Sequence, residues 1–127
     1  MGVFDYPEGV LEIHKEFARA GAEVIQAMAW GVNTNDREEE LHQAAVKIAR
    51  QAAGPERYVA GTLSPFVYSG RSKWSPISEK EKKNAQEFFE RRVTQQTSAG
   101  VDLFIVETFY SVDEVSLAIP FSNSTPN

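Results

Sequence analysis

Residues 99–107 read Ala-Gly-Val-Asp-Leu-Phe-Ile-Val-Glu, and this stretch decides the fold. Gly100 suits the position just after a helix, where a left-handed backbone conformation is common. The run from Leu103 to Val106 is continuously apolar, which is typical of a strand that is buried on both faces of a parallel sheet. A helix that ends directly before such a strand indicates an α/β protein.

The same order of helix, Ala-Gly and apolar run occurs twice upstream, at Ala20-Gly21 and Ala53-Gly54. Helical spacing of apolar residues predicts four helices, and shorter apolar runs between them predict three strands. Ser78 with Glu81 matches the capping box that opens a helix, and Ser111 with Glu114 repeats it. The predicted helices cover residues 7–20, 37–53, 78–99 and 112–119, and the predicted strands cover residues 24–30, 58–63 and 101–109.

The resulting order, α-β-α-β-α-β-α, predicts right-handed crossovers and a parallel sheet. We expect a partial parallel (β/α)8 TIM-type barrel, because a complete one needs about 250 residues and this chain has 127. The first helix lacks a preceding strand, so the chain is expected to be an incomplete, interior part of the barrel. Residues 1–119 form that partial barrel in this interpretation, and Pro120 ends the last helix, which leaves residues 120–127 as a polar disordered tail.

Composition excludes several classes of function. The net charge is −5 and no extended basic cluster is present, which disfavours a nucleic acid partner. No apolar stretch approaches the ~18 residues of a membrane span, and no secretory signal is recognisable, so we expect a cytoplasmic protein without a membrane partner. The chain has no cysteine, which excludes disulfides, thiolate metal ligands and thiol nucleophiles.

Ligand sites of parallel α/β folds lie at the carboxyl ends of the strands. Glu107 closes the last apolar run, so it is the first candidate for a substrate-binding or acid/base carboxylate; the alternative is a structural Glu that faces solvent or a neighbouring helix. Gln26 ends the first run and could present its amide to a ligand or serve as a structural hydrogen-bonding group. Thr108, next to Glu107, is the third candidate for substrate binding. We assign no catalytic residue.

Other candidates carry weaker patterns. The aromatic residues that follow the strands could surround a cationic or apolar ligand, although such residues more often pack over a core. Each histidine lies in a predicted helix without a partner at metal-ligand spacing, so we interpret both as solvated or capping residues and propose no metal site. The aromatic residues are Trp30, Phe66, Tyr68 and Trp74, and the histidines are His14 and His42.

Four stretches of the chain resemble homocysteine S-methyltransferases, and the betaine-homocysteine type most closely. Residues 6–26 contain Tyr-Pro-Glu-Gly-Val, then His-Lys-Glu-Phe-Ala-Arg-Ala-Gly-Ala, then Val-Ile-Gln, and resemble the family's first helix and second strand. Residues 40–51 resemble the next helix, residues 59–64 the third strand and residues 100–109 the fourth. The resemblance extends from about Pro7 to Ile119.

The resemblance implies a zinc-dependent barrel that moves a methyl group from betaine or S-methylmethionine to the thiol of homocysteine, giving methionine. In that family a Glu at the end of the fourth strand helps to hold the amino-acid part of homocysteine, and Glu107 matches its position. The chain departs from the family at its first strand, which is missing with its Asp-Gly-Gly motif, and at the zinc thiolates, because no cysteine is present. Zinc therefore cannot be held here by the family mode, and differences around Trp30 and Gly31 leave the methyl donor open.

Three hypotheses follow from the sequence. The leading one is a fragment of a homocysteine S-methyltransferase-like enzyme that is inactive alone, with homocysteine and a methyl donor as the partners of the whole protein. The second is a non-catalytic interaction module that pairs through exposed sheet edges with another copy or with a complementary half-barrel. The third is a metal-free barrel enzyme that uses Glu107 as an acid or base.

Overall fold

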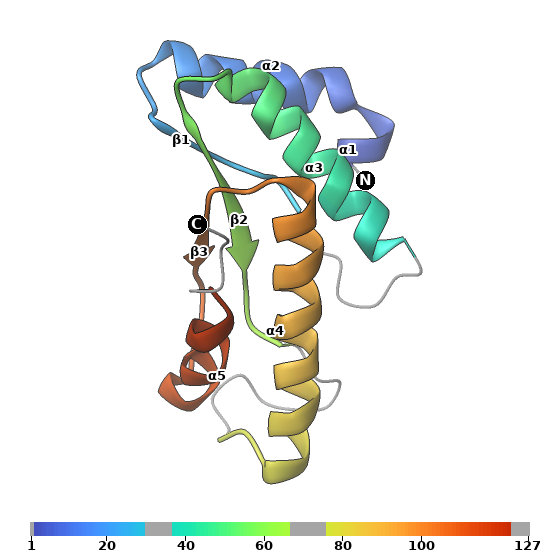
Figure 1. Ribbon diagram of the computed structural model, residues 1–127, viewed down its shortest axis with the longest axis vertical. Coiled ribbons are helices and arrows are strands. Elements are labelled where there is room, and N and C mark those ends of the chain that lie inside the picture. The colour runs from blue at the N-terminus through green and yellow to red at the C-terminus, as the bar shows by residue number, and fades with distance from the viewer. Residues whose placement is uncertain (1, 30–36, 67–75, 123–127) are drawn as a thin grey trace.

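The computed structural model describes residues 2–29, 37–66 and 76–122. Figure 1 shows the alternation of helices and strands along these segments. The order is α1 (Gly2–Asp5), α2 (Pro7–Arg19), β1 (Val24–Gln26), α3 (Glu38–Ala53), β2 (Tyr58–Leu63), α4 (Glu79–Ala99), β3 (Leu103–Val106) and α5 (Val112–Ser122). The predicted order of the major elements is confirmed, and the short helix α1 is an addition that the sequence pattern did not indicate.

The strands form a parallel sheet with the order β1-β2-β3 in the part of the chain that the structure describes. Helices α3 and α4 pack against the same sheet, and Figure 1 shows them on one side of β2. A parallel sheet covered by preceding and following helices is the unit from which α/β barrels are built. The described residues thus form a parallel α/β fold, and the partial TIM-type barrel stays a prediction.

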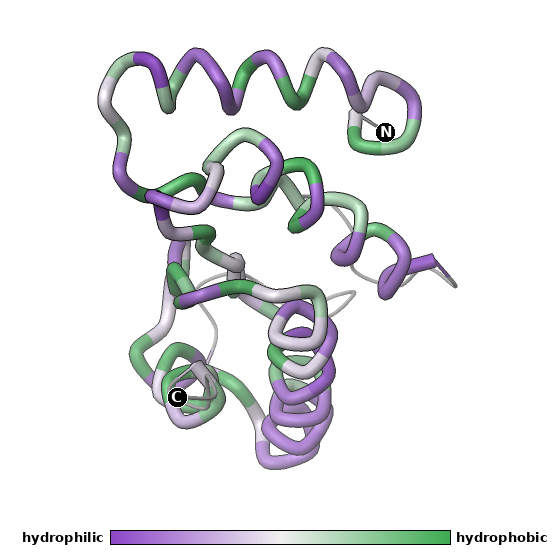
Figure 2. Tube along the Cα trace, turned by 45° about the horizontal axis from the view of Figure 1, so that its top comes forward, coloured by the Kyte–Doolittle hydropathy of each residue, from purple (hydrophilic) through white to green (hydrophobic). Residues whose placement is uncertain are grey.

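Helix α4 begins with the capping box that the sequence predicted. Ser78 accepts a hydrogen bond from the Glu81 N–H at 3.3 Å, and the Glu81 carboxylate accepts one from the Ser78 N–H at 2.8 Å. Gly100 follows the helix with φ of 99°, the left-handed conformation that favours glycine. Figure 2 shows α4 as mainly hydrophilic, in contrast to the mainly hydrophobic α5. The helix therefore buries a narrow stripe that includes Phe88 and Phe89.

Three predictions about the ends of elements are wrong. Strand β3 covers Leu103–Val106 instead of residues 101–109. Strand β1 ends at Gln26 instead of continuing through Ala29, and helix α5 continues through Pro120 to Ser122 instead of ending at Ile119. Proline removes one backbone donor from the last turns of α5, but Leu117 and Phe121 on either side of it pack against the cluster around Phe88 and Ala118. Packing of the apolar helix thus outweighs the lost hydrogen bond. Residues 123–127 of the expected tail lie outside the described residues.

The two histidines are buried, which contradicts their interpretation as solvated or capping residues. His14 is 5% exposed and His42 is 0% exposed. His42 lies between α3 and α4, where its Nδ1 is 2.8 Å from the Gln95 side-chain oxygen. Since that oxygen can only accept, Nδ1 carries the proton and Nε2 is the unprotonated acceptor. Burial lowers the pKa of both imidazoles, so both are neutral in the folded protein at pH 7.

We expect the free energy of unfolding to decrease as the pH falls from about 7 to 5. The folded pKa of each histidine lies below its unfolded value of about 6.5, so the unfolded chain binds more protons in this range and folding loses up to about 1.4 kcal/mol per histidine and pH unit. Urea denaturation at several pH values measures the slope. The H14Q/H42Q double variant is expected to flatten it, and an unchanged slope in that variant would contradict the assignment.

No helix within the described residues is both long and apolar enough to cross a membrane.

Candidate substrate-binding site at the carboxyl ends of the strands

Three polar side chains occupy one face of the sheet at the ends of its strands. Gln26 is paired with Ala60, so Thr62, two residues further on, lies on the same face. Thr62 in turn is paired with Ile105, which places Glu107 on that face as well. Helices α3 and α4 pack on the opposite face, where a side chain at Gly61 would meet α4. The row Gln26–Thr62–Glu107 therefore lies on the face that these helices leave uncovered.

Hydrogen bonds connect the row into one unit. The Gln26 side-chain nitrogen donates to Thr62 Oγ1 at 2.8 Å and to Glu107 Oε1 at 2.6 Å. Both protons of the amide are used in this way, which fixes the amide with its oxygen directed away from the carboxylate. Thr62 is buried, whereas Gln26 and Glu107 are half-buried and remain accessible. The row is thus ordered by its own contacts before any ligand is bound.

The atoms left over in this row are acceptors. Within the described residues, the Gln26 side-chain oxygen and Glu107 Oε2 make no hydrogen bond. Unused carboxylate and amide oxygens on neighbouring side chains suit a group with several N–H donors and a positive charge, such as an ammonium. The three side chains of the row offer no remaining donor for a carboxylate, because Gln26 uses both amide protons and the Thr62 hydroxyl donates to the Ala27 carbonyl at 3.5 Å.

The backbone of Thr62 is hydrogen-bonded by Gln96 of helix α4. Gln96 is 0% exposed. The Gln96 side-chain oxygen accepts from the Thr62 N–H at 2.8 Å, and its nitrogen donates to the Thr62 carbonyl at 3.0 Å. Close approach of α4 to the strand requires glycine at position 61, because a Cβ there would lie 2.8 Å from Gln96 Oε1 and 2.8 Å from the Phe104 ring. Glycine at this position therefore allows the Gln96 and Phe104 side chains to pack directly against the backbone of β2.

The sequence predicted Gln26 and Glu107 as site residues but did not indicate Thr62 or Gln96. Glu107 and Gln26, both predicted from their positions at strand ends, are in direct contact. Thr62 was counted as an ordinary strand residue, although strand alternation alone would have placed it on the face of the other two. Gln96 lies within the predicted helix 78–99 and was not among the candidates. A polar residue on an otherwise apolar stripe was the available indication of its role.

The other candidates lie outside the row. Thr108 is exposed and has φ of 62°, an uncommon conformation for a β-branched residue that stores strain directly after Glu107. Its role in substrate binding stays a prediction. Phe66 packs against Phe88 of α4 with ring centroids 5.2 Å apart, which is a core contact. Trp30, Tyr68 and Trp74 lie outside the described residues.

The residues present do not fit a zinc site of the thiolate kind. Zinc in proteins is bound by thiolates, imidazoles and carboxylates that converge on one point. The sequence contains no cysteine, and no group of three or more His, Asp or Glu side chains in the described segments could hold a metal ion. The zinc that the resemblance implies is therefore not matched by donors in this chain.

Comparison with known proteins identifies relatives along nearly the whole chain. A model of the family described as homocysteine S-methyltransferase matches residues 2–125. Betaine-homocysteine S-methyltransferase 1 of Danio rerio is 26% identical over 132 residues, which cover 95% of this chain and 31% of that protein. The Xenopus tropicalis protein of the same name is 30% identical and is covered over 30% of its length. S-methylmethionine-homocysteine S-methyltransferase BHMT2 of Pongo abelii is 27% identical.

The fold has a counterpart among solved structures. The crystal structure of the apo form of the homocysteine methyltransferase MmuM from Escherichia coli superposes with a TM-score of 0.76 and 24% sequence identity. The match covers 99% of this chain and 48% of that one. The chain thus spans about a third of the length of these curated relatives and about half of the solved structure. Since the family match extends over almost every residue, the chain belongs to the homocysteine S-methyltransferase family.

Proposed function

We propose that the row Gln26–Thr62–Glu107 binds the α-ammonium group of homocysteine, as part of a methyltransferase that forms methionine. The observation that carries this proposal is the double hydrogen bond from the Gln26 amide to Thr62 and Glu107. It leaves the Gln26 oxygen and Glu107 Oε2 as unused acceptors on two half-buried neighbouring side chains. The names of the relatives supply homocysteine as the amino acid with such an ammonium group.

Charge supports the ammonium over the other groups of an amino acid. Glu107 carries the negative charge of the row, and no Arg or Lys takes part in the hydrogen bonds that join its three members. A substrate carboxylate would face two acceptor oxygens and be repelled. The thiol of homocysteine would consequently point away from this row, toward whatever group activates it.

We infer that this chain does not transfer the methyl group by itself. The relatives act on homocysteine with betaine or S-methylmethionine according to their names, and they are about three times as long as this chain. No donors for the thiolate zinc site are present, so no step of the proposal uses a metal. The chain contributes the row Gln26–Thr62–Glu107, which recognises the ammonium group of the amino acid.

Titration calorimetry under reducing conditions tests the proposal. We expect E107Q to weaken homocysteine binding by about 10- to 100-fold, because a hydrogen bond to a charged group contributes about 1.5–3 kcal/mol. The control E90Q, at an exposed position on α4, is expected to bind as the unchanged chain does. An analogue without the amino group, 4-mercaptobutyrate, should bind weakly to all three proteins.

Equal binding of homocysteine to E107Q and the unchanged chain would exclude the proposed role of Glu107. Incubation of the chain with homocysteine and betaine, or with S-methylmethionine, is expected to yield no methionine. Methionine formation that a chelator abolishes would contradict the inference that the chain is inactive alone.

A further inference from the structure

The chain leaves strand β3 through a strained residue, Thr108, directly after Glu107. Thr108 has φ of 62°, and within the described segments it is the one residue other than glycine with a positive φ. This left-handed conformation is unfavourable for a β-branched side chain, which is why glycine usually occupies such positions. Thr108 is exposed, so burial of its own side chain does not explain the conformation. The explanation lies in the residues on either side of it.

The alternation of side chains along β3 is reversed at this residue. Successive side chains of a strand face opposite sides of the sheet. Val106 packs against the apolar cluster between α4 and α5, whereas Glu107 lies on the open face in the substrate row. Continued alternation would bring Phe109 to the open face beside Glu107. Phe109 instead packs against Phe89 of α4, with ring centroids 5.9 Å apart, so the direction changes at Thr108.

The backbone is fixed on both sides of Thr108. The Glu107 N–H donates to the Leu63 carbonyl at 3.0 Å, so hydrogen bonding to β2 extends as far as Glu107. On the other side, the ring of Phe109 contacts Phe89, which is 0% exposed and belongs to the core. A single residue therefore has to change the course of the chain between a paired strand and a packed aromatic ring.

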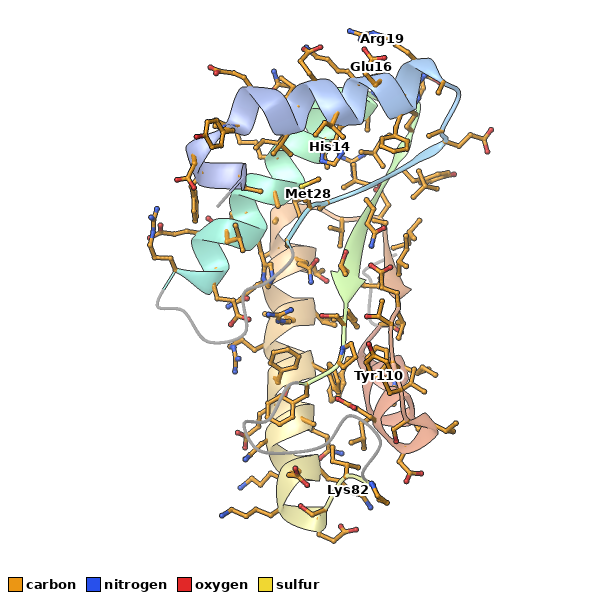
Figure 3. All side chains as sticks on the ribbon, turned by 180° about the vertical axis from the view of Figure 1, so that it is seen from behind. His14, Glu16, Arg19, Met28, Lys82 and Tyr110 are labelled. Atoms are coloured by element: carbon orange, nitrogen blue, oxygen red, sulfur yellow. The ribbon has the colours of Figure 1, made fainter. Side chains whose placement is uncertain are left out.

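Helix α5 limits the length of chain that can adjust. The helix begins three residues after Phe109. Its first turn is held by Glu114, which is 1% exposed and accepts a hydrogen bond from the Phe66 N–H at 2.6 Å. Figure 3 labels Tyr110 in this connection, where the chain passes from β3 to α5. The short connection leaves little chain over which the strain could be distributed.

We propose that Thr108 is a positioning residue for the ammonium site, because its left-handed backbone lets Glu107 face the substrate while Phe109 anchors the chain in the core. The inference rests on the proposed function of the row that contains Glu107. With an extended residue at position 108, either Phe109 would leave the apolar cluster or Glu107 would turn away from Gln26. Packing of Phe109 maintains the strain, and backbone strain of this kind clusters at functional sites. The role belongs to the backbone, so the Thr108 hydroxyl needs no contact with the substrate.

Nuclear Overhauser effects in the full chain test this geometry without a ligand. We expect a strong effect between the amide and α protons of Thr108, which is the signature of a positive φ, and another between the Gln26 side-chain amide and the Glu107 γ protons. The variant F109A should lose both, because the chain after β3 can then continue in an extended form. The matched control F121A removes an aromatic side chain that packs on the same cluster from the end of α5, and it should keep both.

Homocysteine binding, measured as above, tests the functional part of the proposal. At a temperature at which all variants are folded, F109A should bind about tenfold or more weakly than the unchanged chain, since the charged acceptor of the row is displaced. The control F121A should bind as the unchanged chain does. A loss of affinity in F109A alone therefore reports on the position of Glu107 and not on general destabilisation.

Substitutions at position 108 separate the backbone from the side chain. Glycine adopts the left-handed conformation without steric cost, so T108G should raise Tm by about 2–6 °C, although glycine usually destabilises a protein. Proline fixes φ at about −65°, so T108P should lose the contact between Gln26 and Glu107 and bind homocysteine about tenfold or more weakly than T108G. If the Thr108 hydroxyl bound the substrate, T108G and T108P would both lack it and bind equally weakly.

Three results would overturn the proposal: a contact between Gln26 and Glu107 that persists in F109A, a lower Tm for T108G than for the unchanged chain, or equal homocysteine binding by T108G and T108P. Absence of homocysteine binding by the unchanged chain would instead contradict the proposed function. The contact between Gln26 and Glu107 in F109A would still decide the role of Thr108, because it is observed without a ligand.

Discussion

Replacing Glu38 with alanine is expected to lower the free energy of unfolding by about 3–5 kcal/mol, the range typical for removing one partner of a buried ion pair. Glu38 Oε1 accepts from Arg92 Nε at 2.9 Å, and its other oxygen accepts from Arg91 Nε at the same distance. Arg92 is 3% exposed and lies over the Phe88 ring at 4.4 Å. Without the carboxylate, the Arg92 charge would stay buried against an aromatic surface with its main counterion removed.

Burial already lowers the pKa of Arg92, which shows how unfavourable this environment is for a charge. Glu38 opens helix α3, whereas Arg91 and Arg92 lie on α4, so the same ion pair holds the two helices that cover the sheet. The loss would be a large fraction of the ~5–15 kcal/mol that typically separates folded from unfolded domains.

Urea denaturation followed by circular dichroism measures this effect. The matched control is Glu40→Ala on the same helix, where the exposed pair with Arg37 contributes at most about 1 kcal/mol. A loss below about 1 kcal/mol for E38A, equal to that of the control, would show that Arg92 finds another partner or reaches solvent.

The sequence was sufficient for the parts of the fold that depend on local pattern. Glycine after each of the first three predicted helices, and a continuous apolar run after Gly100, predicted the order of helices and strands because both features act within a few residues. The proximity of Gln26 and Glu107, 81 residues apart, also followed, since the carboxyl ends of parallel strands meet at one edge. The parallel topology therefore places Gln26 and Glu107, which were predicted separately from their strand ends, in one site.

The errors concern side chains whose environment is set by distant elements. His42 stands among charged residues in the sequence, yet it is enclosed between α3 and α4 and bonds to Gln95. Phe17 has the spacing of a core residue, yet no described element covers it. Helical periodicity indicates which residues share a face, but it contains no information on whether a partner for that face is present.

At the carboxyl end of β2, the side chain of Gln96 makes the hydrogen bonds that the backbone of a neighbouring strand would otherwise make. The register of β1 and β2 would pair the Thr62 N–H with the Ala27 carbonyl and the Thr62 carbonyl with the Ala29 N–H. Strand β1 has ended before this point, and the Ala29 N–H bonds to the Ala27 carbonyl instead. The Gln96 side-chain amide replaces both partners: its oxygen accepts from the Thr62 N–H at 2.8 Å, and its nitrogen donates to the Thr62 carbonyl at 3.0 Å.

Replacing Gln96 with leucine is therefore expected to cost about 2–5 kcal/mol of unfolding free energy, because each of two buried backbone groups would lose its partner at about 1–3 kcal/mol. Leucine fills nearly the same volume, so the loss reports on hydrogen bonds rather than on a cavity. The control Q43L exchanges the same residue types at an exposed site of α3 and should change stability by less than about 0.5 kcal/mol.

Hydrogen exchange distinguishes this explanation from general destabilisation. In Q96L the Thr62 amide should lose protection beyond the global change, whereas the Ala60 amide, on a residue of the same strand that lies opposite Gln26 in β1, should follow the global change only. Equal loss of protection at both amides would contradict the specific role of Gln96. Because Thr62 positions the Gln26 amide, Q96L should also weaken homocysteine binding, and a variant that binds normally would separate the strand end from the substrate row.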